Sequence, residues 1–237
     1  MQKLRSTILL IRPYEQSIVF AAEFLAETGS DVVIIPSPVL TVEPVLPLPD
    51  PEGAIALVFT SANAVRIFAQ GGKGRGLRAY CVGASTANAA RGAGYRAVSA
   101  GGDVSDLLDM LAVSHDQSDA PYLYLHGEKV AADLAGLLKE RGIPVRAQTI
   151  YRQVEQPLSD KARQALAGRD VIVPLFSANS AKIFARQVRP LPKHRVQFVC
   201  MSRAVAGALT GFDENDIHIA AHPSRDGMIK AIAELVL

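Results

Sequence analysis

The nonapeptide Ser61-Ala-Asn-Ala-Val-Arg-Ile-Phe-Ala69 returns, 116 residues later, as Ser177-Ala-Asn-Ser-Ala-Lys-Ile-Phe-Ala185. Six of the nine positions are identical, and each copy follows an apolar run, at residues 54–59 and 171–176. An apolar run that stops at a serine and continues into a helical pattern is typical of a buried strand followed by a helix. The sequence therefore predicts the same strand–turn–helix unit twice.

The repeat extends well beyond the nonapeptide, because residues of about 7–110 resemble residues of about 121–232. Short apolar runs alternate with amphipathic stretches, and most runs lack an alternation of apolar and polar residues. Such runs are typical of parallel strands that are covered on both faces. The pattern therefore predicts a duplicated α/β fold with parallel sheets. Strands are predicted at residues 7–11, 32–36, 55–59, 78–82, 97–100, 122–125, 144–152, 171–176, 196–201 and 217–221, and helices at 15–28, 128–141 and 224–236.

Two stretches interrupt this rhythm. Residues 36–51 contain six prolines, and residues 147–157 are extended and rich in strand-forming residues. Proline-rich segments form stiff, extended linkers. Because both stretches follow a strand–helix–strand unit, we expect them to connect two lobes.

Composition excludes several classes of protein. The 237 residues include 25 basic and 23 acidic ones, for a net charge of +2, which argues against an electrostatic nucleic-acid binder. No run approaches the roughly 18 apolar residues of a membrane span, and the N-terminus lacks a secretory pattern. We expect a cytoplasmic protein without membrane contact. The two cysteines, Cys81 and Cys200, lie in apolar runs and are predicted to be buried, reduced thiols, with no metal site.

The Ser-Ala-Asn turns could bind anions. The first N–H groups of a helix lack partners and carry a positive dipole, so a helix that follows a parallel strand offers an anion site. Ser61 and Ser177 can cap the two helices, and Ala62 and Ala178 let a ligand approach the backbone, while Asn63 and Asn179 complete the turns. Two such turns in two lobes would face a shared cleft and hold one large polyanion. Capping alone also explains both serines, and the same two interpretations apply to Ser85, Thr86 and Ser202.

No conventional catalytic motif is present, so individual residues have to be weighed. Tyr151 lies in a predicted crossing strand, where it could donate a proton to a ligand or simply pack its ring at an interface. Arg12, at the end of the first strand, could bind a carboxylate or pair with a nearby acid. His126 and His222 follow strands, and for each of them a polar loop role is the simpler interpretation.

Several motifs, taken in their order and spacing, are shared with one known family. They are RP at residues 12–13, VFTSANAV at 58–65, CVGASTANAARGAG at 81–94, GEKVAADLAGLLKERGIPVRAQTIYR at 127–152, FSANSAKIF at 176–184 and HPSRDGMIKAI at 222–232. Through these motifs nearly the whole chain resembles the uroporphyrinogen-III synthases.

The resemblance implies two similar, flavodoxin-like α/β lobes with parallel sheets, joined by a two-stranded β linker. One lobe would be discontinuous, with residues 1–36 and 156–237, the other would take residues 48–146, and residues 37–47 and 147–155 would form the linker strands. It also implies a hydro-lyase that dehydrates linear hydroxymethylbilane and closes the ring with inversion of ring D, giving uroporphyrinogen III in haem, chlorophyll and cobalamin biosynthesis. The family uses no metal or organic cofactor, and we expect a monomer.

The resemblance also implies roles for residues. Tyr151 matches the family's tyrosine and would help the hydroxyl to depart. Ser224 matches a serine or threonine of the last loop, although it could only cap the final helix. His126 stands where the family commonly has arginine, and Lys129 could compensate for the lost carboxylate contact. Met201 replaces a usual glycine beside Ser202.

Rival interpretations remain open from the sequence. A non-catalytic, two-lobed binding protein for a polyanion such as a tetrapyrrole would have the same layout, as would a degenerate family member without turnover. A flavodoxin-like regulatory protein would carry flavin-binding or phosphoacceptor motifs, such as an acidic cluster after the first strand, but Ile11 and Arg12 occupy that place.

Overall fold

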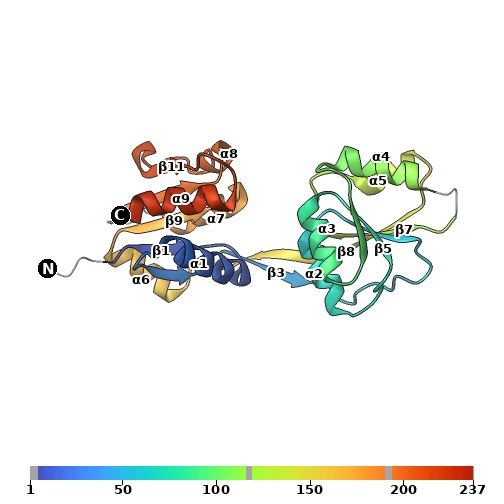
Figure 1. The fold of residues 1–237 in the computed structure, drawn as a ribbon, viewed down its shortest axis with the longest axis horizontal. Coiled ribbons are helices and arrows are strands. Elements are labelled where there is room, and N and C mark those ends of the chain that lie inside the picture. The colour runs from blue at the N-terminus through green and yellow to red at the C-terminus, as the bar shows by residue number, and fades with distance from the viewer. Residues whose placement is uncertain (1–4, 116–118, 190–193, 237) are drawn as a thin grey trace. The chain divides into compact units, whose positions relative to one another are not determined.

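The apolar runs assemble into two separate sheets, each within its own compact unit (Figure 1). The computed structural model describes residues 5–115, 119–189 and 194–236. One unit comprises residues 1–41 and 154–237 and is called here the discontinuous unit; the other comprises residues 42–153 and is called the central unit. Mixed α/β structure with parallel sheets is confirmed.

The discontinuous unit contains a five-stranded sheet in the order β11-β10-β9-β1-β2, and all neighbouring strands are parallel. Apolar side chains of both faces are buried under helices, as expected for parallel strands. The strands are β1 (Thr7–Leu10), β2 (Val33–Pro36), β9 (Val171–Leu175), β10 (Val196–Cys200) and β11 (Ile217–Ile219). The helices are α1 (Tyr14–Thr28), α6 (Asp160–Gly168), α7 (Ala178–Gln187), α8 (Arg203–Ala206) and α9 (Arg225–Val236), with a 3-10 turn at Glu214–Asp216.

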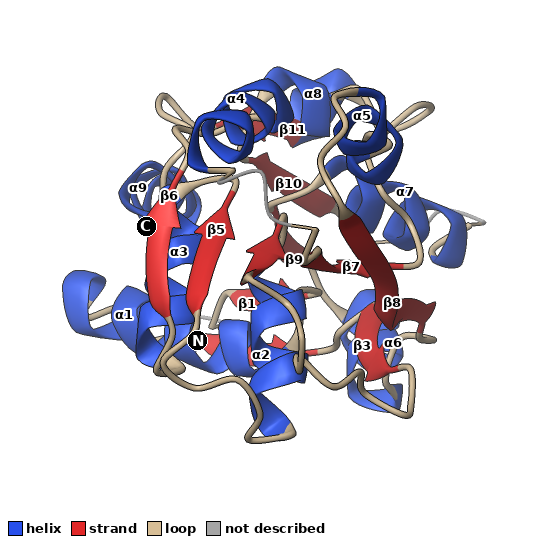
Figure 2. Cartoon of the chain, turned by 90° about the vertical axis from the view of Figure 1, so that its right-hand side faces the viewer, coloured by secondary structure: helices blue, strands red, loops and turns tan. Residues whose placement is uncertain are grey.

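The central unit contains a six-stranded sheet in the order β3-β8-β7-β4-β5-β6 (Figure 2). From β8 to β6 the neighbouring strands are parallel, and two apolar cores cover the two faces of the sheet. The strands are β3 (Leu40–Pro44), β4 (Ala56–Phe59), β5 (Arg78–Cys81), β6 (Arg96–Ser99), β7 (Tyr122–Gly127) and β8 (Val145–Glu155). The helices are α2 (Ala62–Gln70), α3 (Ala84–Gly92), α4 (Val104–Ser114) and α5 (Leu134–Glu140).

Each of the two sheets contains strands from both copies of the internal repeat. Strands β1 and β2 come from the first copy of the repeat, but they pair with β9–β11 of the second copy. Likewise β7 and β8 of the second copy pair with β4–β6 of the first. The five-stranded sheet therefore combines two strands of the first copy with three of the second, and the six-stranded sheet combines two strands of the second copy with four of the first, β3 to β6. The orders β2-β1-β9-β10-β11 and β8-β7-β4-β5-β6 correspond.

The division between the units falls inside two neighbouring strands. It separates Thr41 from Val42 in β3 and Gln153 from Val154 in β8. These strands are neighbours in the sheet, and on the central side the Val45 amide donates to the Ile150 carbonyl at 2.9 Å. The proline-rich stretch therefore contains a strand, β3. Its prolines do not prevent the pairing, because they lie outside β3 or at its last residue, Pro44.

All ten predicted strands are confirmed, with ends shifted by at most a few residues. The helix predicted for residues 128–141 is wrong in its first half, because α5 begins only at Leu134. The Asp133 side chain accepts a hydrogen bond from the Gly136 amide at 2.9 Å, and an aspartate at this position starts a helix more readily than it continues one. The predicted helix stops are confirmed, since Gly29 and Gly142 have φ angles of +61° and +71°.

No helix in the described ranges is long and apolar enough to cross a lipid bilayer. In the same ranges, no group of three or more histidine, cysteine, aspartate or glutamate side chains is placed to hold a metal ion.

The two cysteines occupy equivalent places in the two sheets, because Cys81 is the last residue of β5 and Cys200 is the last residue of β10. Both thiols are free and have no exposed surface, which confirms the prediction. Burial raises the pKa of Cys81 from its usual 9.0 to about 11 and that of Cys200 to about 12.

Because the thiolate is the reactive form, both thiols should resist alkylation in the folded protein. At pH 8 roughly one Cys81 thiol in a thousand would be ionised, against roughly one in ten for an ordinary thiol. We expect iodoacetamide to modify neither cysteine of the native chain within the time that modifies both in urea, as measured by intact mass. Native alkylation at the rate of the unfolded chain would contradict the burial described here.

Candidate functional site

Polar residues gather at one edge of each sheet. In a parallel sheet the carboxyl ends of all strands share an edge, and ligands of open α/β sheets bind there. In the discontinuous unit this edge carries Arg12 after β1, Ser177 after β9 and Ser202 after β10. In the central unit it carries Ser61 after β4 and the end of β7.

The two Ser-Ala-Asn turns have nearly the same backbone geometry. Ser61 has φ −148° and ψ 137°, and its hydroxyl oxygen accepts a hydrogen bond from the Asn63 amide at 3.1 Å. Ser177 has φ −147° and ψ 144°, and its hydroxyl oxygen accepts from the Ser180 amide at 3.2 Å. The predicted capping is confirmed for both. Ala62 and Ala178 are the first helical residues, so each helix begins with a residue whose side chain is a single methyl group.

The capping interpretation is wrong for two other serines. Helix α3 is capped by Gly83, which has no side chain to contribute, and Ser85 lies exposed inside the first turn. Thr86, next to it, is buried with 6% of its surface exposed. Ser202 occupies the N-cap position of the four-residue α8 but makes no side-chain capping bond.

Arg12 stands out in the discontinuous unit because its guanidinium is partly buried and incompletely paired. One terminal nitrogen donates to Gln16 Oε1 at 3.0 Å, while the buried Nε has no hydrogen-bond partner among the described residues. The guanidinium carbon lies 3.9 Å from the ring centroid of Phe176, a stacking distance for a cation on an aromatic face. Burial lowers the pKa of Arg12, and the charge of Glu23 acts in the opposite direction. An arginine nevertheless stays charged at neutral pH.

The structure brings Arg12 and the second Ser-Ala-Asn turn together. Both line a hollow of about 210 Å³, which Gln16, Phe176 and Ser180 also line. A fixed guanidinium beside a helix N-terminus can hold a carboxylate, because both supply N–H donors and positive charge. Arg12 and Ser177, which the sequence singled out separately, thus line the same hollow.

In the central unit, Tyr151 is held against a glycine. It lies in β8 opposite Gly127 of β7, next to a bulge between His126 and Gly127. A Cβ atom at Gly127 would lie only 2.5 Å from the Tyr151 Cζ and 2.8 Å from its hydroxyl oxygen, so only glycine leaves room for the ring. The Glu128 amide donates to the Tyr151 carbonyl at 2.9 Å. The ring is 8% exposed, and its hydroxyl has no hydrogen bond within the described chain.

Two further hydroxyl groups lie near this edge, and the sequence analysis missed both. The hydroxyl oxygens of Tyr124 and Thr60 are 3.3 Å apart. Burial raises the pKa of Tyr124, the contact with Thr60 opposes this, and Tyr151 and Asp133 raise it further. The sequence positions of both residues could have indicated them: Thr60 directly precedes the turn serine Ser61, and Tyr124 lies two residues before His126.

His126 has a defined tautomer. Its Nδ1 lies 2.8 Å from the Gly127 carbonyl oxygen, and because a carbonyl only accepts, Nδ1 carries the proton. Its ring lies 4.7 Å from the Tyr124 ring, centroid to centroid. An imidazole does not supply the planar fork of five N–H donors that an arginine would supply at this place.

The last two predicted residues stand apart from these groups. Lys129 lies in the exposed turn before α5 and forms no hydrogen bond or ion pair within the described residues. Ser224 is exposed, and its hydroxyl oxygen accepts from the Gly227 amide at 3.1 Å at the start of α9. The capping interpretation is confirmed for Ser224.

Comparison with known proteins gives one consistent result. The model of the family described as uroporphyrinogen-III synthase HemD matches residues 20–230. Uroporphyrinogen-III synthetase from Helicobacter pylori 26695 is 17% identical and similar in structure, with a TM-score of 0.64 over 98% of this chain and 100% of that one. A mutant uroporphyrinogen III synthase from the extremely thermophilic bacterium Thermus thermophilus is 18% identical, with a TM-score of 0.51 over 97% of this chain and 98% of that one. No curated protein matches. Because the family match spans most of the sequence, this chain belongs to the uroporphyrinogen-III synthase family.

Proposed function

We propose that this chain dehydrates linear hydroxymethylbilane and closes the ring with inversion of ring D, which yields uroporphyrinogen III for tetrapyrrole biosynthesis. The match to the synthase family over residues 20–230 carries this proposal. It favours a cyclising hydro-lyase over the alternative, a non-catalytic binding protein for a polyanion. The chain would act as a cytoplasmic monomer.

The proposal includes a finer description of the fold. The two lobes would be residues 1–36 with 156–237, and residues 48–146, joined by linker strands at 37–47 and 147–155. Each lobe would be flavodoxin-like, which is supported by the spatial order shared by β2-β1-β9-β10-β11 and β8-β7-β4-β5-β6. A linker in two neighbouring strands is supported by the unit boundary, which passes through β3 and β8.

The substrate of this reaction carries eight carboxylates, and we assign their binding to the carboxyl edges of the two sheets. In the discontinuous unit Arg12 and the turn Ser177–Ala178–Asn179 supply donors, and Ser202 lies at the next strand end. In the central unit the turn Ser61–Ala62–Asn63 does the same, followed by Ser85 and Thr86 in α3. Lys129 and Ser224 would contact carboxylates from exposed loops. The hollow shared by Arg12 and Ser177 is the observation that supports this assignment most directly.

The proposed reaction needs only weak acid catalysis from a side chain. The carbon–oxygen bond breaks as the pyrrole nitrogen donates electrons, and the hydroxyl takes one proton and leaves as water. The methylene carbon then bonds to the substituted carbon of ring D, a spiro intermediate rearranges, and a ring proton is lost. We assign Tyr151 the hydrogen bond, or the proton, that assists the departing hydroxyl.

Geometry decides the product. Without guidance the terminal carbon bonds to the unsubstituted position of ring D, and the symmetrical isomer I forms. Holding the chain so that the substituted carbon is nearer is catalysis by positioning. Tyr151 suits such a role because Gly127 and the bulge beside it leave its ring one place to occupy.

The function is tested by giving the purified chain freshly prepared hydroxymethylbilane and separating the isomers chromatographically. We expect isomer III to predominate and to scale with protein concentration. A mixture rich in isomer I and equal to the protein-free blank would reject the synthase function and leave the binding-protein alternative.

The role of Tyr151 is tested by Tyr151→Phe, which keeps the ring on Gly127 and removes the hydroxyl. Loss of the assisting hydrogen bond should lower kcat by about 10- to 100-fold and raise the share of isomer I. Tyr95→Phe is the matched control, because it removes another buried hydroxyl of the central unit, bonded to the Lys73 carbonyl at 3.2 Å. Full activity and an unchanged isomer ratio in Tyr151→Phe would remove Tyr151 from the mechanism.

The role of Arg12 is tested by Arg12→Gln. If Arg12 holds a carboxylate in both the ground state and the transition state, KM should rise about tenfold while the isomer ratio stays constant. The KM of Arg12→Lys should lie between those of the unmodified chain and Arg12→Gln, since lysine keeps the charge but not the planar stack on Phe176. Arg5→Gln, which breaks an exposed ion pair with Asp31, should change neither parameter. An Arg12→Gln variant with the KM of the Arg5→Gln control would contradict the assignment.

A further inference from the structure

One half of the central unit is strongly basic. Between Glu52 and Asp103 the sequence contains no acidic residue at all. The same fifty residues contain six basic ones: Arg66, Lys73, Arg75, Arg78, Arg91 and Arg96. The chain as a whole has a net charge of only +2, so this half departs from the composition of the rest.

Two of these arginines lie directly opposite each other. Strands β5 and β6 pair in parallel, with Arg78 and Arg96 as partner residues. Each side chain is held by a neutral group: Arg78 Nη1 donates to the Tyr80 hydroxyl at 3.3 Å, and Arg96 Nε to the Gly76 carbonyl at 2.7 Å. Like charges at opposed positions of a sheet destabilise it. A bound anion would offset that repulsion.

A third arginine and a hollow complete the group. Arg78, Arg91 and Arg96 line an open hollow of about 330 Å³ together with Tyr95, Ala97 and Val98. Arg75 is close by, because a Cβ at Gly94 would lie 3.8 Å from its Cγ. We call Arg75, Arg78, Arg91 and Arg96 the arginine group.

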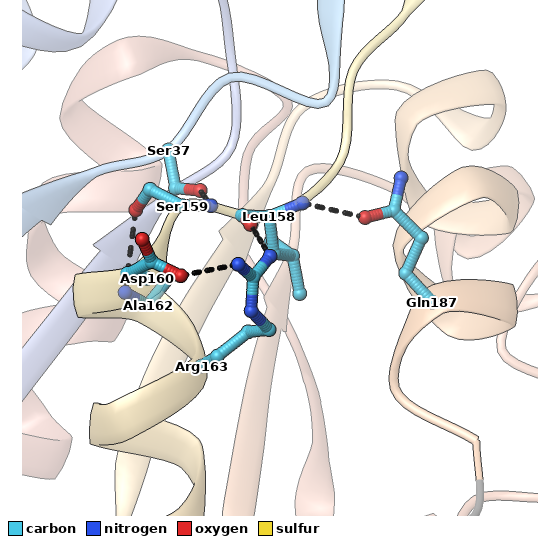
Figure 3. A network of polar contacts seen from close by, with 7 residues as sticks. All are labelled: Ser37, Leu158, Ser159, Asp160, Ala162, Arg163 and Gln187. Atoms are coloured by element: carbon cyan, nitrogen blue, oxygen red, sulfur yellow. Dashed lines mark hydrogen bonds and ion pairs between the residues drawn. The ribbon is translucent and has the colours of Figure 1, made fainter.

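The arginine group differs in its partners from those arginines of the chain that form ion pairs. Seven arginines elsewhere, from Arg5 to Arg225, form ion pairs with aspartate or glutamate. One of them, Arg163, also belongs to the hydrogen-bond network that joins Ser37, Leu158 and Gln187 at the start of α6 (Figure 3). No member of the arginine group has an acidic partner within the described residues. Its charge is thus available to another molecule.

The group borders a free strand edge. Strand β6 is the last strand of the sheet, and β5 is its one partner strand among the described residues (Figure 2). The amides of Arg96 and Ala100 donate to carbonyls of residues 77 and 81 on the β5 side. Because backbone amides alternate along a strand, those of Ala97 and Ser99 point to the free edge. Val98 is 42% exposed beside them, so the edge offers hydrogen bonds, an apolar contact and positive charge together.

From these observations we propose that β6 and the arginine group form a docking site for an extended, acidic segment of a partner protein. The segment adds a strand beside β6, its backbone bonding to Ala97 and Ser99, while its glutamates or aspartates meet Arg78, Arg91 and Arg96. The site lies at the amino ends of β5 and β6, opposite the carboxyl edge that carries the proposed substrate contacts, and it goes beyond the synthase function.

A second copy of this chain does not fit the same edge. It would bring the same six basic residues of 53–102 and no acidic residue of that stretch to the edge, so it offers no charge complementarity. Charged residues do protect edge strands from such pairing. Protection of the edge explains why a charged residue, Arg96, lies on β6. It does not explain Arg78 and Arg91, because these lie on β5 and α3 and not on the edge strand.

The test uses the full-length protein and a labelled seven-residue peptide in which glutamate alternates with valine. We expect fluorescence anisotropy to show saturable binding that weakens as NaCl is raised. Hydrogen exchange should slow at the Ala97 and Ser99 amides, and not at Arg96, whose amide is already bonded to β5. The same peptide with glutamine in place of glutamate is expected to bind at least about tenfold more weakly.

Variants separate this site from general attraction. Arg78→Gln/Arg96→Gln should raise the Kd of the peptide about tenfold or more. The matched control Lys139→Gln/Arg141→Gln removes two charges from the α5 end of the same unit and should leave Kd unchanged. Both double variants should keep full synthase activity, which also shows that they are folded and separates this test from that of the proposed function.

Three results would overturn the proposal. The first is no peptide binding up to about 1 mM, a concentration that still detects interactions of about 4 kcal/mol. The second is a Kd that is equal in the two double variants. The third is that inorganic pyrophosphate or a short DNA duplex binds through Arg78 and Arg96 while the peptide does not, which would make the group a site for a small anion or for nucleic acid.

Discussion

Parallel pairing is the constraint on which the rest of this structure depends. Because β1 lies parallel between β2 and β9, and β7 lies parallel between β8 and β4, each sheet delivers all of its strand ends to one edge. Helices begin at that edge with their N–H groups free. The serine turns, Arg12 and Tyr151 all owe their places to this geometry, which needs no special motif beyond a small residue after the capping serine.

A family with this layout can be catalytic without a nucleophile or a metal, because the difficult part of the reaction is the shape of a flexible substrate. What the protein must supply is rigidity where the ligand is held. In the proposed site the Gly127–Tyr151 contact would supply it in the central unit, and the stack of Arg12 on Phe176 would supply it in the discontinuous unit. In both places a side chain is confined by a neighbour from another element before any ligand arrives, so less freedom is lost on binding.

The sequence was sufficient for whatever depends on neighbouring residues. Apolar runs located the strands, and capping was one of the two interpretations that the sequence offered for Ser61, Ser177 and Ser224, because a cap lies within three residues of the amide it satisfies. The sequence was insufficient for features that depend on residues far apart in the chain. An apolar run does not encode which strand lies beside it, so the opposition of Arg78 and Arg96 could not be seen. The contact between Thr60 and Tyr124 is of the same kind. The helix predicted for residues 128–141 is too long because its sequence pattern does not show that Asp133 is the N-cap of α5.

The exchange of strand pairs between the two copies of the repeat has a consequence for how the protein is made. Residues 42–153 hold nearly all of the central sheet and leave the ribosome as one continuous stretch. The first 36 residues emerge earlier, yet β1 and β2 gain their third partner, β9, only when residue 171 and those after it have been synthesised. The opening segment, with its apolar strands and α1, therefore stays without the rest of its sheet through most of translation.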